Sequence, residues 1–158
     1  MFSRLHTSGV AWMRFYEFQW PSAGGGNCDL VLRTAAKEAA AGIPLVVHGF
    51  AGPNPISGAA AGTVFQLAAF LATATSKHSY FGVSTSYQDA GWGWERLYDV
   101  KYGAPVAGLV RNGSRYYREL RNTHVHVDCT KGGAGAQLLP KADPGTAQRH
   151  ATLMHGRH

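Results

Sequence analysis

The stretch "IPLVVHGF", residues 43–50, indicates the fold class of this protein. It is an uninterrupted apolar run of strand length, which is typical of a strand covered on both faces. Such strands belong to parallel sheets, in which the next strand is reached through a crossover connection, usually a helix. The segments on either side of this run are therefore expected to be helical.

Both flanking segments have a helical pattern. Upstream, Asn27 is a candidate cap for a helix that runs to Gly42, with Asp29 in its first turn. One predicted buried stripe on this helix consists of Cys28, Val31, Leu32, Ala35 and Ala39. Downstream, a second helix is predicted from Gly62 to about Lys77. Its predicted apolar face consists of Val64, Leu67, Ala68, Leu71 and Ala74.

Two more strands are predicted outside the helices. They are "GVAWMRFYEF" (9–18) and "SYFGVST" (79–85), so residues 9–85 have the order β-α-β-α-β. Three strands and two helices are too few to close an eight-stranded barrel. The fold class is therefore predicted to be α/β, with a partial (β/α) barrel-type parallel sheet.

The chain changes character after the third strand. "SRYYREL" and "THVHVDC" (123–129), joined by a tight turn, predict a C-terminal β-hairpin. From Lys131 on, the sequence has no period. The expected domains are thus a barrel-like unit with its hairpin over residues 1–130 and a disordered tail over residues 131–158.

Charge and cysteines restrict the class of protein. Residues 1–110 carry seven Lys and Arg against six Asp and Glu, whereas residues 111–158 carry eight against three. Without a basic cluster or a nucleic-acid-binding module, we expect no specific nucleic-acid partner.

Cys28 and Cys129 make no disulfide framework, which fits a reducing compartment. No apolar run reaches membrane-spanning length and no secretory signal precedes the domain pattern, so a native start would imply a cytoplasmic protein.

Carboxylates and tryptophans follow the predicted strands. In parallel α/β proteins, function gathers at the carboxyl ends of the strands. Carboxylates can cleave a glycosidic bond, and aromatic rings stack on sugars, so this set predicts a carbohydrate site without metal or cofactor. The alternative for Glu17 is an ion pair with Arg14 or Arg96. The predicted catalytic residues are Glu17, Asp89 and Glu95, and the predicted substrate-binding residues are Trp20, His48, Tyr87, Trp92 and Trp94.

Residues 9–129 resemble the C-terminal part of glycoside hydrolase-like TIM-barrel proteins. The resemblance is carried by "SYFG", by the two tryptophans of "GWGWE", by "YDVKYGAP" and by the aromatic-Arg-acid pattern of "YRE", residues 117–119. It implies that the sheet corresponds to the last strands of a barrel, with Glu17 as catalytic acid or nucleophile and Trp92 and Trp94 as sugar-stacking residues. The first half of such a barrel would be missing, so the resemblance also implies that this half or a second copy completes the protein.

Three other readings remain open. A barrel fragment of this kind could bind carbohydrate or protein without catalysis. "PLVVHGFAGP" also resembles the strand and oxyanion turn of α/β-hydrolases, which would make Ser84 of "GVSTS" the nucleophile. The second glycine of the G-x-S-x-G elbow is replaced by Ser86, which argues against an esterase. Lastly, His124, His126 and Asp128 share one face of a strand, as metal ligands would, but a half-buried hairpin strand alternates in the same way.

Overall fold

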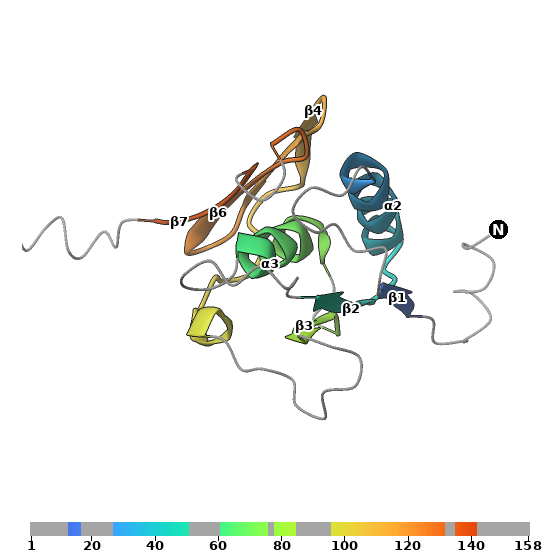
Figure 1. Ribbon diagram of the computed structural model, residues 1–158, viewed down its shortest axis with the longest axis horizontal. Coiled ribbons are helices and arrows are strands. Elements are labelled where there is room, and N and C mark those ends of the chain that lie inside the picture. The colour runs from blue at the N-terminus through green and yellow to red at the C-terminus, as the bar shows by residue number, and fades with distance from the viewer. Residues whose placement is uncertain are drawn as a thin grey trace, which may run out of the picture.

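The computed structural model describes six stretches of the chain, which contain seven β-strands, two α-helices and one 3-10 helix. They are arranged in three layers, with the helices between a parallel and an antiparallel sheet (Figure 1). The described residues are 13–16, 27–50, 61–75, 78–84, 96–131 and 135–141.

The parallel sheet consists of β1 (Arg14–Tyr16), β2 (Leu45–Phe50) and β3 (Tyr80–Ser84), in the order β1-β2-β3. Both pairings are parallel, as the sequence predicts, and join Tyr16 to Val47 and Phe50 to Ser84. Because each strand runs in the same direction, their carboxyl ends lie at one edge of the sheet.

Helix α2 (Cys28–Ala40) confirms its predicted stripe, since all five of those residues are buried. The chain leaves the helix through Gly42, whose φ of 78° suits glycine. At the other end Asn27 contributes its backbone carbonyl, which accepts from the Val31 N–H at 2.9 Å, and makes no side-chain capping bond.

Helix α3 (Ala61–Thr73) corrects its predicted stripe. Leu67 and Ala68 are buried as expected, but Val64, Leu71 and Ala74 are only partly buried. A helix between two sheets is buried on both sides, and β2 and β3 lie on one side of α3 while β5, β6 and β7 lie on the other (Figure 1). The buried residues outside the predicted stripe include Thr63, Phe65, Gln66, Ala69, Ala72 and Thr73.

The antiparallel sheet is larger than the predicted hairpin. Its order is β4 (Val110–Asn112), β5 (Arg115–Glu119), β6 (Thr123–Asp128) and β7 (Ala136–Pro140). The predicted hairpin corresponds to β5 and β6, and the predicted alternation in β6 is confirmed. Strand β7 lies within the segment predicted to be disordered, so that prediction is wrong for residues 136–140.

The segment after the 3-10 helix η1 (Arg96–Asp99) runs beside the β5–β6 turn. The Arg121 N–H donates to the Ala104 carbonyl at 2.9 Å, and the Asn122 N–H donates to the Tyr102 carbonyl at 3.1 Å. Gly103 has a φ of 85°, and a Cβ there would come within 2.7 Å of the Arg121 Cβ. The "YGAP" segment is thus a docked strand-like connection that needs its glycine.

Cys28 and Cys129 form a disulfide that ties the start of α2 to the end of β6. The interpretation of two unpaired cysteines is therefore wrong, and with it the argument from free thiols for a reducing compartment. The bridge lies beside one buried core that includes Leu32 of α2, Phe65 of α3 and Val125 of β6. None of the helices among the described residues is long and apolar enough to span a membrane.

Candidate functional site

The candidate site lies where the three parallel strands end. Strand β1 ends at Tyr16, directly before the predicted catalytic Glu17, and β2 and β3 end at Phe50 and Ser84. The pairing of Phe50 with Ser84 puts the ends of β2 and β3 level with each other. Parallel sheets gather functional groups at this edge.

His48 and Ser84 meet at this edge. The His48 Nε2 and the Ser84 Oγ are 2.8 Å apart, within hydrogen-bond distance. Both residues lie on the sheet face that is turned away from the helices, because β2 and β3 alternate their side chains and Val47 and Val83 belong to the helix side. Only 9% of His48 and 5% of Ser84 is exposed, so this pair is shielded from bulk water.

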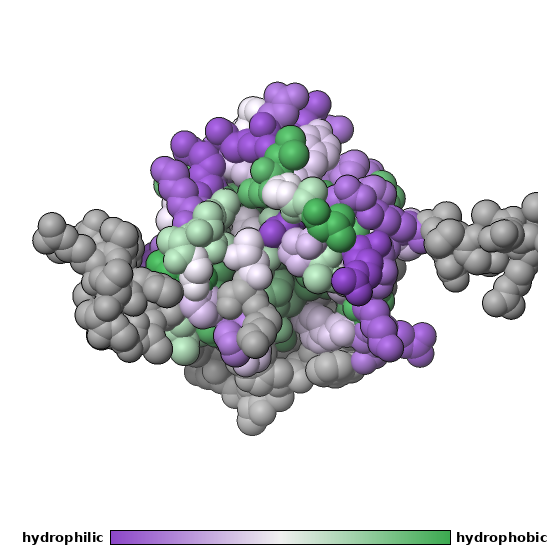
Figure 2. All heavy atoms as spheres, turned by 180° about the vertical axis from the view of Figure 1, so that it is seen from behind, coloured by the Kyte–Doolittle hydropathy of each residue, from purple (hydrophilic) through white to green (hydrophobic). Residues whose placement is uncertain are grey.

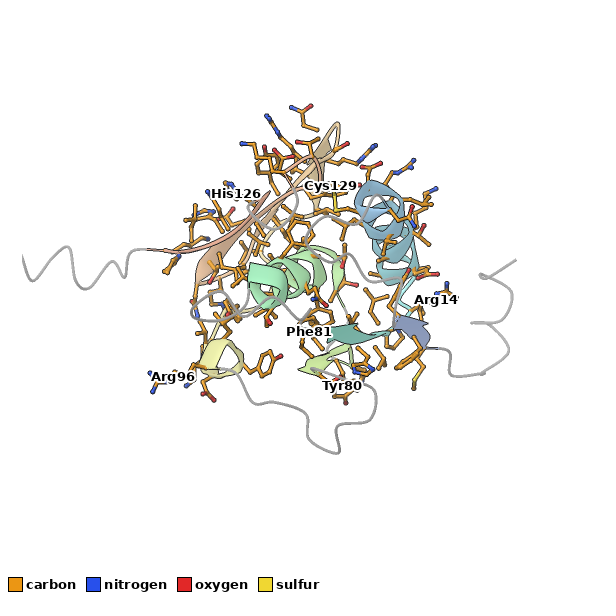
Figure 3. All side chains as sticks on the ribbon, viewed as in Figure 1. Arg14, Tyr80, Phe81, Arg96, His126 and Cys129 are labelled. Carbon is orange, nitrogen blue, oxygen red and sulfur yellow. A yellow bond between two sulfur atoms is a disulfide. The ribbon has the colours of Figure 1, made fainter. Side chains whose placement is uncertain are left out.

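The same face becomes open toward the amino ends of the strands. Phe15 is 52% exposed and Tyr80 is 63% exposed, although both side chains are large and apolar or aromatic. On the opposite face Phe81 packs against Phe70 of α3 with ring centroids 5.4 Å apart. Figure 3 shows Phe81 on the α3 side of the sheet and Tyr80 on the other.

Ionic groups on the helix side of β1 have a structural role. The Tyr16 hydroxyl donates to Glu38 Oε2 at 2.5 Å, and Arg14 forms an ion pair with Glu38 Oε1 at 3.5 Å. Burial, followed by the hydrogen bond to the Glu38 carboxylate, raises the pKa of Tyr16 well above its ordinary value. Arg14, considered above as a partner of Glu17, thus contacts a carboxylate of α2.

A polar side chain of α3 also lies against β2. Gln66 is buried against Gly49 of β2, where an added Cβ would come within 1.9 Å of the Gln66 Oε1. Thr63 is buried as well. Gln66 was not among the predicted site residues, although a glutamine inside the apolar run "VFQLAAF" was the available signal.

The other predicted site residues lie outside the described stretches. His48 is the only predicted site residue within the described part of the chain. The remaining predictions therefore stay predictions. They concern Glu17, Trp20, Tyr87, Asp89, Trp92, Trp94 and Glu95.

The histidines of β6 lie beside residues that already have partners within the described part of the chain. Asp128 accepts from the hydroxyl and the N–H of Thr130 and from Arg115 at 3.0 Å, and these contacts, those of Thr130 above all, lower the pKa of its carboxyl group. The ring of His126 packs edge-on against Tyr117. Among the described residues, no three His, Cys, Asp or Glu side chains come together as metal ligands do.

Much of the positive charge of the C-terminal third is used within the protein. Arg111 pairs with Asp29, Arg115 with Asp128 and Lys141 with Glu119, while Arg118 is buried. Seen from behind, hydrophilic side chains gather at the end of the molecule formed by β4 and are interspersed with apolar ones (Figure 2). Among the described residues, three of the cations of the C-terminal third are thus paired with carboxylates of the protein itself.

A comparison of the sequence with models of known protein families and with curated proteins finds no match.

Proposed function

We propose that the protein acts on or binds a carbohydrate at the edge where β1, β2 and β3 end. The observation that carries this proposal is the winding of the parallel sheet: its strands follow one another in chain order, and both α2 and α3 pack on the same face. Strands in chain order with both helices on one face occur in a (β/α) barrel and also in one βαβαβ half of a doubly wound sheet. In both folds function gathers at the carboxyl ends of the strands, so the winding supports a site at this edge, and the resemblance to barrel proteins favours the barrel-type segment.

In a barrel-type segment, the face opposite the helices is the interior face. It carries Phe15, Val46, Tyr80, and the His48–Ser84 pair at the carboxyl end. In the sequence, Glu17 directly follows β1, and Trp92 and Trp94 follow β3. We propose that the Glu17 carboxylate acts at this site and that the two indole rings stack on sugar.

A parallel sheet of this kind is normally covered on both faces. The exposed Phe15 and Tyr80 therefore support the prediction that more protein completes the sheet, as the N-terminal half of a barrel or as a second copy of the chain. Light scattering on the purified chain distinguishes the two: a dimer supports the second copy, and a monomer supports a separate half.

A second candidate function is acyl transfer, which the His48–Ser84 distance of 2.8 Å favours. A serine hydroxyl becomes a nucleophile when a histidine accepts its proton. Ser84 is the last residue of β3, however, and Ser86 occupies the second glycine position of a nucleophile elbow. We therefore place this function second.

The test is binding and turnover on a panel of oligosaccharides and on p-nitrophenyl esters. Glycoside hydrolysis that is lost in Glu17→Gln while binding remains supports an enzyme with Glu17 as its acid or nucleophile. Binding without turnover that is lost in Trp92→Ala/Trp94→Ala supports a binding module. Ester hydrolysis lost in Ser84→Ala supports the second candidate.

Glu119→Gln is the matched control for Glu17→Gln, because Glu119 is an exposed carboxylate on the antiparallel sheet. A comparable loss in this control, or no binding to any saccharide, overturns the carbohydrate proposal.

A further inference from the structure

The outer face of the antiparallel sheet contains a polar pocket of about 250 Å³. Its floor comes from β5, β6 and β7, and its rim from Lys131 and Gly135 in the β6–β7 connection. Figure 3 shows His126 on the side of this sheet that is turned away from α3. The pocket is therefore separated from the strand ends of the parallel sheet by the helix layer, and a ligand bound in it would not depend on the proposed function.

The floor is a row of three side chains across three strands. Register pairs Tyr117 with His126 and His126 with Gln137. The Tyr117 and His126 rings meet edge to face, with centroids 5.0 Å apart and planes at 75°. This arrangement presents an aromatic surface next to an imidazole and an amide, which together match the apolar face and the hydroxyl groups of a sugar ring.

One wall of the pocket is a fixed guanidinium group. The Arg115 Nε donates to Asp128 Oδ2 at 3.0 Å, and Asp128 Oδ1 accepts from the Thr130 N–H at 2.9 Å and from its hydroxyl at 2.6 Å. Asp128 thereby orients Arg115. Within the described residues, the two Nη groups of Arg115 have no protein hydrogen-bond partner, so they can bind a planar oxyanion.

The rim is held close to the floor. The Lys131 N–H donates to the Asp128 carbonyl at 3.2 Å, which fixes the turn that carries the Lys131 ammonium group. On the other side of the connection, a Cβ on Gly135 would come within 2.1 Å of the same carbonyl oxygen, so only glycine allows this approach. These two backbone contacts hold the β6–β7 connection at the rim of the pocket.

The charge of the lining selects the ligand. Arg115 and Lys131 are cationic and Asp128 is anionic, so the three charges sum to a single positive charge, which suits a monoanion better than a phosphate dianion. Pockets for drug-sized ligands measure about 300–1,000 Å³. A pocket of about 250 Å³ suits a single ring.

We propose that this pocket binds a carboxylate carried on a sugar ring, as in a uronic acid unit. The carboxylate lies against the Arg115 Nη groups and Lys131, the apolar face of the ring lies on Tyr117, and ring hydroxyls bond to Gln137 and His126.

The test uses the full chain and follows the His126 ring signals by NMR during titration with galacturonic acid, neutral galactose, acetate and inorganic phosphate. Galacturonic acid is expected to shift the His126 signals in a saturable way and to bind at least about tenfold more tightly than galactose. Arg115→Gln is expected to weaken its binding by about tenfold or more, and Lys131→Gln by a smaller factor.

Arg121→Gln is the matched control, since Arg121 is exposed and does not line the pocket. Equal affinity for galactose or acetate, tighter binding of phosphate, equal weakening in Arg121→Gln, or no saturable shift overturns the proposal. Titration with a galacturonate oligosaccharide identifies the source: binding with the same dependence on Arg115 supports a polysaccharide, and binding of the monosaccharide alone supports a free sugar acid. Thermal unfolding of each variant verifies that it is folded.

Discussion

The His48 Nε2 lies 2.8 Å from the Ser84 Oγ, and this contact joins the ends of two neighbouring parallel strands in a shielded position. Removing the hydroxyl in Ser84→Ala leaves a buried imidazole nitrogen without this partner. We expect the free energy of unfolding to fall by about 1–3 kcal/mol, measured by urea denaturation. Ser114→Ala, in the β4–β5 turn, is the control and should change stability by less than about 0.5 kcal/mol. Equal stability of Ser84→Ala and wild type would show that this hydrogen bond does not stabilise the fold.

Arg118 closes the carboxyl end of α3. Its Nη1 group donates to the carbonyls of Ala72 and Ala74, both at 2.9 Å, and burial lowers the pKa of the guanidinium group. Arg118→Met removes both bonds from buried carbonyls, so we expect a loss of about 2–4 kcal/mol in the free energy of unfolding. The exposed Arg121→Met serves as the control. If both variants unfold at the same denaturant concentration, Arg118 is not a cap.

Reduction of the Cys28–Cys129 bridge should destabilise the protein. The two residues are 101 positions apart. In the chain-entropy account, a loop of about 100 residues corresponds to about 4–5 kcal/mol. Cys28→Ser/Cys129→Ser should therefore melt well below the oxidised wild type, and a reducing agent should lower the melting temperature of wild type alone. Detection of two free thiols in the native protein by mass spectrometry would contradict this prediction.

The Tyr116–Asp29 contact predicts a loss of stability at alkaline pH. The Tyr116 hydroxyl donates to Asp29 Oδ1 at 2.6 Å, and burial together with this carboxylate raises the pKa of Tyr116 to about 12. A raised pKa contributes stability that is complete below the unfolded value of about 10 and is lost as the pH rises toward 12. Tyr116→Phe should show a smaller loss between pH 10 and 12 by chemical denaturation. An identical pH profile in both proteins would refute the assignment.

Gly49 and Gln66 form a coupled pair. A Cβ at Gly49 would overlap with the Gln66 Oε1, and Gln66 is buried. Gly49→Ala should cost about 1–3 kcal/mol of stability, whereas Gly49→Ala/Gln66→Ala should recover part of it. Gly108→Ala is the control, because nothing lies within 4 Å of an added Cβ there. Additive losses in the double variant would show that the two positions do not interact.

Local sequence pattern predicted those elements that face a single layer. The stripe of α2 and the alternation of β6 were both correct, because each of these elements has one buried side and one side facing water. The stripe of α3 was partly wrong because this helix packs between two sheets, and a helix buried on two sides has no single apolar face. An apolar run of this kind predicts a helix, but it does not show which residues of the helix face each sheet.

Long-range features were outside the reach of the sequence. Only the β4–β5 turn had a local signal, since the connecting Gly113–Ser114 dipeptide is typical of a two-residue hairpin loop. By contrast, the pairing of β6 with β7 across a Gly-rich connection depends on tertiary context that no local pattern contains. At the candidate site, the apolar run of residues 43–50 correctly predicted that His48 lies near the end of a strand. Its contact with Ser84 could not be predicted, because it depends on the register of β2 against β3.

The disulfide also closes part of the chain into a covalent ring. Residues 28–129 form the ring, which includes β2, α3 and β3, while β1 and β7 lie on the two arms outside it. A single backbone cut between residues 29 and 128 consequently opens the ring without separating the two pieces. Such a nicked chain would keep the mass of the intact protein, apart from one added water, and would divide into two fragments only after reduction.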